Sequence, residues 1–133
     1  METRISYPAV GEIIEFNLLV LGAVRVKRAD RHHVLSRQKI ASAIGQCRSA
    51  EGGLHQKAAV LMRALVAAHA FASGNRRTAF VATKDFVLKN GGKFSIPDDP
   101  HYAGVMRGVR ESRYSDDEIA EWIRNGKIRQ HER

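Results

Sequence analysis

The sequence has little cysteine, no long apolar run and no internal repeat. Its one cysteine, Cys47, cannot form a bridge within the chain, which excludes a small disulfide-stapled domain and fits a reducing compartment. No run of about 18 apolar residues occurs, so no segment is expected to cross a membrane. The nearest candidate, residues 16–26, is short and contains Asn17, and we expect a core helix there rather than a targeting segment. We therefore expect a cytoplasmic protein that does not insert into a membrane.

The composition is sufficient for one folded domain. Of the 133 residues, 44% are hydrophobic and 27% are charged, which is close to the averages of globular proteins. Because the length is near that of a typical domain, we expect residues 1–133 to form a single one. The 22 basic residues exceed the 14 acidic residues and give a net charge of +8. That charge favours an anionic partner, which leaves nucleotide phosphates, nucleic acid, an acidic protein and a membrane surface open.

Apolar residues recur at helical spacing along most of the chain, which predicts an all-α fold. Five helices are expected: residues 9–21, a helix capped by Ser36 that continues through Ile44, one from Leu54 to near His69, one from Gly74 to the stop at Asn90-Gly91-Gly92, and one opened by a capping box at Ser115 to Glu118 and closed by Gly126. Residues 25–33 are expected to form a loop. Few windows alternate, so we expect at most a small β-hairpin, with a short extended piece at 93–96.

The two clearest helices are joined by the sequence HAFASGNRR, residues 69–77. Gly74 permits a tight turn, and the helix that follows it presents unpaired N–H groups and the positive end of its dipole, which together form an anion site. Arg76 and Arg77 lie in a first turn where the dipole disfavours cations, which is easier to understand if an anion binds there. His69 ends the preceding helix and is expected to face the same place as a general base. The stretch therefore predicts a loop that binds phosphates beside a base.

The order and spacing of these residues resemble the signature of the Fic/Doc superfamily, which is His, any residue, Phe, two residues, Gly or Ala, Asn, a variable position and Arg. The matching residues are His69, Phe71, Gly74, Asn75 and Arg77. The alanine-rich helix before the motif, the Thr78-Ala79 after it and the Asn90-Gly91 stop resemble the death-on-curing (Doc) branch, as does the weaker pattern near Asn17 and at 35–44. The resemblance covers most of the chain. It implies a compact helical bundle, with a small β-hairpin flap as an addition, that transfers part of a nucleotide to a protein hydroxyl.

The resemblance also implies a role for each residue of the motif. His69 would be the catalytic base that deprotonates the target hydroxyl, and Phe71 would be a core anchor that fixes the loop. Gly74, Asn75 and Arg76 would form the anion hole, and the Arg77 guanidinium would bind phosphate. The donor would be ATP, or another nucleotide, with Mg²⁺.

Two positions favour the Doc branch over members that transfer AMP. The AMP-transferring members usually have Gly after the Asn of the motif and a second Arg three residues beyond the first, where this chain has Arg76 and Phe80. Doc-type members have a long basic residue and an apolar residue there. For that branch the precedent is phosphate transfer from ATP to a threonine of elongation factor Tu, with control by a separate antitoxin. AMP transfer (AMPylation) is the alternative.

The residue before Gly74 departs from the family pattern. It is Ser73, where members have an Asp or Glu that holds the Mg²⁺ bridging the phosphates. A neutral hydroxyl is a weaker ligand than a carboxylate, and phosphoryl transfer depends on charge neutralisation by metal and arginines. Three possibilities stay open: the nucleotide and water hold the metal while Ser73 assists, the second arginine replaces it in part, or the protein is a non-catalytic relative that binds a nucleotide or a protein partner.

Other candidates point less clearly to a function. His32 and His33 are adjacent, so their side chains point apart, and no Cys or acidic cluster accompanies them, so a metal site is not expected. The basic stretch 107–113 predicts a solvated face, with contact to an acidic partner as the alternative. A nucleic-acid binder is a further hypothesis, but the basic residues are spread out and no recognition helix or aromatic platform stands out. We expect Cys47 and Trp122 to be packing residues.

Overall fold

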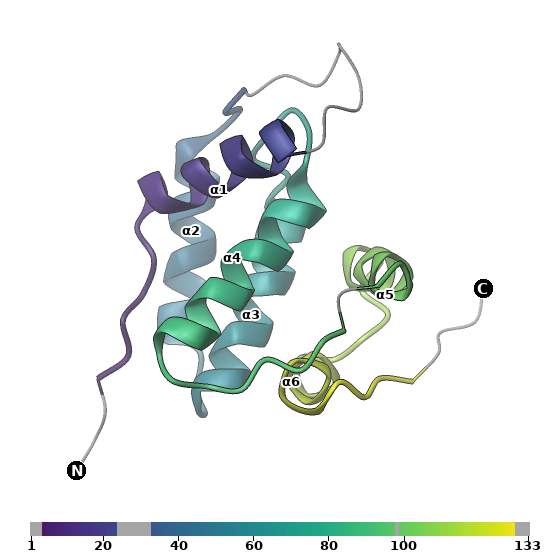
Figure 1. The fold of residues 1–133 in the computed structure, drawn as a ribbon. Coiled ribbons are helices and arrows are strands. Elements are labelled where there is room, and N and C mark those ends of the chain that lie inside the picture. Colours follow the sequence, from purple (N-terminus) through teal and green to yellow (C-terminus); the bar gives the residue numbers. More distant parts are fainter. Residues whose placement is uncertain (1–3, 24–32, 98, 130–133) are drawn as a thin grey trace.

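The computed structural model describes residues 4–23, 33–97 and 99–129. These residues form six α-helices and no strand: α1 (Val10–Ala23), α2 (Arg37–Ser49), α3 (Leu54–Ala68), α4 (Asn75–Lys89), α5 (His101–Arg110) and α6 (Asp116–Asn125) (Figure 1). The all-α prediction is therefore confirmed for the described part of the chain. Within these ranges the β-type pairing is an isolated bridge between Val34 and Phe71, so no hairpin forms there. Most of the loop expected at 25–33, including His32, lies outside the described residues.

The helix α3 occupies the centre of the compact bundle. It packs against α2, α4, α5 and α6, and most of its residues are buried, as expected for a helix that is covered on several sides. Its alanines let the neighbouring helices approach closely. Figure 1 shows α1 and α2 on one side of α3 and α4, and α5 and α6 on the other. Cys47 and Trp122 belong to the common core, as predicted, and burial raises the pKa of the Cys47 thiol to about 11.

Local capping signals in the sequence are confirmed. Ser36 begins α2 and its hydroxyl accepts a hydrogen bond from the Lys39 N–H. Ser115 and Glu118 form the reciprocal capping box at the start of α6. Gly126 ends α6 in a left-handed conformation with a φ of 73°. These bonds involve residues within a few positions of one another, which is why the sequence alone predicts them.

The helix α5 was not predicted, and its presence corrects the sequence analysis, which expected only a solvated basic face at 107–113. Its apolar residues Tyr102, Val105, Met106 and Val109 are three, four and seven positions apart, and the last three are buried. The Tyr102 ring lies against Phe80 of α4, with 4.5 Å between the ring centroids. These contacts hold α5 beside the start of α4. The short piece at 93–96 forms no strand, although the Ser95 N–H donates to the Ile123 carbonyl of α6 at 2.7 Å.

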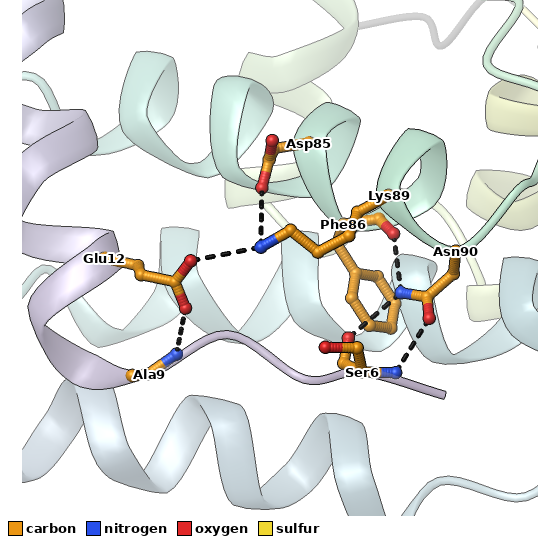
Figure 2. A network of polar contacts seen from close by, with 7 residues as sticks. All are labelled: Ser6, Ala9, Glu12, Asp85, Phe86, Lys89 and Asn90. Atoms are coloured by element: carbon orange, nitrogen blue, oxygen red, sulfur yellow. Dashed lines mark hydrogen bonds and ion pairs between the residues drawn. The ribbon is translucent and has the colours of Figure 1, made fainter. Parts of the chain in front are cut away.

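The beginning of α1 is bound to the end of α4 by charged groups (Figure 2). The Glu12 carboxylate accepts hydrogen bonds from the Ala9 N–H at 2.8 Å and from Lys89 Nζ at 3.1 Å. Asp85 lies 3.6 Å from the same Lys89 ammonium group. The backbone bond and Lys89 lower the pKa of Glu12 from its ordinary value, and Glu12 raises the pKa of Lys89. Helix α1 is thereby held antiparallel along α4.

Asn90 strengthens the same junction at the predicted end of α4. Its side-chain amide accepts from the Ser6 N–H at 2.7 Å and donates to the Ser6 carbonyl at 3.0 Å (Figure 2). Gly91, with a φ of 79°, then turns the chain away from the helix. None of the described helices is both long and apolar enough to cross a membrane.

Candidate active site

The loop from residue 69 to residue 74 joins α3 to α4 through two left-handed residues. His69 ends α3 with a φ of 47°, and Gly74 begins α4 with a φ of 78°. The segment before α2 pairs with this loop by backbone hydrogen bonds, from the Leu35 N–H to the Ala70 carbonyl at 2.7 Å and from the Ala72 N–H to the His33 carbonyl at 3.0 Å. Backbone pairing of this kind holds the loop in one conformation beside the bundle.

Asn75 uses its side chain to fix the loop and the histidine ring. Its amide oxygen accepts from the Phe71 N–H at 3.0 Å and its amide nitrogen donates to the Phe71 carbonyl at 2.8 Å, which settles the orientation of the amide. The same nitrogen lies 3.3 Å from Nδ1 of His69. Phe71 is 2% exposed and anchors the loop in the core.

Asn17 supports the loop from α1. It is fully buried, and its side-chain nitrogen donates to the Ser73 carbonyl at 3.0 Å and to the Thr78 hydroxyl at 3.1 Å. A polar residue in the apolar face of 9–21 was the sequence signal for such a role, but its partners lie far along the chain. Burial of a bonded amide is favourable only while both partners stay in place, so α1 and the loop fix each other.

A cavity of about 470 Å³ opens beside the loop. The predicted site residues His69, Ser73, Gly74, Asn75, Arg76 and Arg77 all line it, whereas Phe71 lies in the core beneath. The structure adds lining residues that the sequence did not indicate, namely Val66, Ala72, Tyr102, Ala103, Met106, Arg107 and Arg110. Five of these seven come from α5, so the unpredicted helix supplies the wall that faces the motif.

The start of α4 provides backbone donors at this cavity. The Thr78 N–H donates to the Gly74 carbonyl at 2.9 Å, which is the first hydrogen bond of the helix. The amides of Asn75, Arg76 and Arg77 precede it, and Gly74 has no side chain to cap them. These amides and the positive end of the helix dipole suit an anion.

The comparison with known families agrees with this geometry. The sequence model of the Fic/DOC family matches residues 13–87, more than half of the chain. The chain belongs to the Fic/DOC family. The matched span runs from α1 through α4 and includes Asn17, the loop and the first turn of α4, while α5 and α6 lie beyond it. No curated protein matches the chain. Membership in the Fic/DOC family indicates nucleotide-dependent protein modification in general and does not distinguish the Doc branch.

The charge of the Fic/DOC cavity suits phosphates better than a metal ion. Its described lining residues include four arginines and one histidine, and none of these described residues is Asp or Glu. The Ser73 hydroxyl is buried and has no hydrogen-bond partner among the described residues. In the described ranges no three or more His, Cys, Asp or Glu side chains come together as a metal site. Mg²⁺ binds proteins through carboxylates, so this donor set does not fit a protein-held Mg²⁺.

Proposed function

We propose that this Fic/DOC protein is a Doc-like toxin that transfers a phosphate group from ATP to a protein hydroxyl in the cytoplasm. The observation that carries the proposal is the convergence of His69, the uncapped amides of α4 and four arginines on one cavity. A base, backbone donors and guanidinium groups are the parts that phosphoryl transfer requires. Tyr102, Met106 and Val66 add an apolar part to the cavity that suits a nucleoside.

The reaction needs one proton transfer and one exchange of bonds at phosphorus. His69 takes the proton of the target hydroxyl at its unprotonated ring nitrogen while the hydroxyl oxygen attacks the γ-phosphorus. The new oxygen–phosphorus bond forms as the bond to the bridging β-phosphate oxygen breaks, and ADP leaves. The amides of α4 and the guanidinium groups stabilise the charge on the phosphoryl oxygens.

The choice of phosphate transfer over AMP transfer is supported at two positions. Arg76 is exposed at the cavity, where a bulky cationic side chain changes how a triphosphate lies along the loop. Phe80 is 8% exposed and packs on Tyr102, so it joins α4 to α5 and offers no group to a phosphate. By the precedent of the Doc branch, the target is a threonine of elongation factor Tu and a cognate antitoxin controls the activity.

The test uses ATP labelled on either phosphorus. Purified protein is incubated with elongation factor Tu and ATP labelled at the α- or the γ-phosphate, with His69→Ala as the control. We expect label on the target from the γ position only and its loss in His69→Ala. Label from the α position would replace phosphate transfer by AMP transfer. Equal labelling by His69→Ala would contradict the role of His69.

A second candidate function is a non-catalytic family member that binds a nucleotide or a protein partner. The buried Ser73 hydroxyl, which has no partner in the described part of the chain and stands where the family has a carboxylate, favours it. Under this candidate the wild-type protein binds nucleotide without labelling any target, and Ser73→Asp gains labelling in the presence of Mg²⁺. Labelling by the wild type without Ser73→Asp would exclude it.

A further inference from the structure

One face of α5 lines the cavity. Ala103, Met106, Arg107 and Arg110 are three, four and seven positions apart and all line it, as the helical repeat predicts for residues on one face. Tyr102 on the adjoining face packs against α4. The packing of α5 in the core therefore fixes the position of Arg107 and Arg110 at the cavity. Both arginines lie outside the matched span 13–87 and outside the loop motif.

Within the described part of the chain, no acidic side chain neutralises these two arginines. Neither Arg107 nor Arg110 forms an ion pair with another described residue, although Arg63, Lys89 and Arg113 do. Both are exposed at the cavity. The negative end of the α5 dipole favours basic residues in its last turn, which explains their presence in part.

A helix dipole does not explain the basic residues on the opposite wall of the cavity, which α4 supplies. Arg76 and Arg77 lie in the first turn of α4, where the dipole disfavours cations, and they face the same cavity as the α5 arginines. Four guanidinium groups lie around one cavity, and no carboxylate is among the lining residues that the structure describes. Such groups repel one another unless an anion lies between them. A chain of several phosphates is an anion that arginine forks from two walls bind at once.

We propose that Arg107 and Arg110 bind the phosphates of the nucleotide from the α5 side and supply the positive charge that Mg²⁺ supplies where a carboxylate holds it. The nucleotide then binds this protein without a divalent metal. The inference rests on the proposed function in one respect, namely that the cavity takes a nucleoside triphosphate. It goes further in naming the residues that replace the metal.

The experiment is a calorimetric titration of the full chain with the β,γ-imido analogue of ATP, once with Mg²⁺ and once with EDTA. The variant Arg107→Gln/Arg110→Gln removes both charges from α5. The matched control Arg124→Gln/Lys127→Gln removes two charges from exposed positions that do not line the cavity. Circular dichroism melts show that each variant is folded, and Arg107→Lys/Arg110→Lys separates the loss of charge from the loss of the planar fork.

We expect the wild-type dissociation constants with Mg²⁺ and with EDTA to agree within about threefold. Arg107→Gln/Arg110→Gln should weaken binding at least tenfold in EDTA, since each charge-assisted hydrogen bond contributes substantially, and the control pair should weaken it far less. Binding that needs Mg²⁺, or that the α5 variant leaves unchanged, would overturn the inference while the proposed function stands. A wild-type protein that binds the analogue in neither condition would overturn the proposed function as well.

Discussion

Gly74 meets two constraints at a single position. Its φ of 78° lies in the left-handed region that side chains disfavour. A Cβ there would lie 3.1 Å from Leu21 Cδ2 and 3.2 Å from Asn17 Nδ2. Asn17 cannot move away without losing its hydrogen bonds to Ser73 and Thr78. Glycine is therefore required at this position both for the turn and for the approach of α1 to the loop.

Replacement of Gly74 by alanine should lower the free energy of unfolding by about 1–3 kcal/mol, because it adds backbone strain and crowds Asn17. Urea denaturation measures this change. Gly45→Ala is the matched control: it lies within α2 with nothing within 4 Å of its added Cβ, and it should stabilise the protein by about 0.5–1 kcal/mol. Equal effects of the two substitutions would contradict the role given to Gly74.

At the scale of elements, the orientation of α1 matters most for the loop, because α1 carries Asn17. The contacts of Glu12 with Ala9 and Lys89 hold one end of α1 against α4 (Figure 2), and Asn17 holds its middle against the loop. The Glu12 and Lys89 side chains are each about 40% exposed, so water screens their attraction and the contribution to stability is modest.

Glu12→Gln should lower the free energy of unfolding at neutral pH by about 0.5–1 kcal/mol. The pKa of Glu12 is lowered below its ordinary value of 4.5 by the Ala9 bond and by Lys89. Its carboxylate therefore stabilises the fold above that value, and the contribution disappears as the pH falls through the lowered pKa. Urea denaturation at about pH 7 and about pH 3 should show the difference between wild type and Glu12→Gln shrinking at the lower pH. A difference that stays constant would contradict this account.

The elements also show what the sequence reveals and what it does not. Helices α2 and α6 were predictable, because Ser36 and the Ser115 capping box act over three residues. Helix α5 was missed although Tyr102, Val105, Met106 and Val109 have helical spacing. Its short length, its two glycines and the basic run 107–113, which overlaps the end of the helix, favoured a solvated surface instead.

The candidate site divides in the same way. The motif 69–77 is local, so the sequence predicted the loop, the glycine turn and six of the residues that line the cavity. The bonds from Asn17 to Ser73 and Thr78 join residues 56 and 61 positions apart, and no local pattern encodes them. By the resemblance Asn75 belongs to the anion hole, and the structure shows that its side chain bonds to the Phe71 backbone. The packing of α5 against α3 and α4 brings Arg107 and Arg110 to the motif.

At the scale of the whole molecule, part of the positive charge behind the net charge of +8 is concentrated at one place. The composition alone favoured anionic partners of several kinds, but four of the arginines surround one cavity between α4 and α5. The family match ends within α4, and the opposite wall comes from the part of the chain beyond it. The proposed site is therefore a property of the described fold and not of the motif alone.

The central claim is that this cavity binds the phosphates of a nucleotide. The most direct test is a titration of ¹⁵N-labelled protein with ATP, followed by amide chemical shifts. We predict that the largest shifts fall in residues 72–77 and 103–110, which contain most of the residues that line the cavity. The amides of α2 and the end of α6 should change little. Absent shifts, or shifts concentrated on another face of the molecule, would contradict the account.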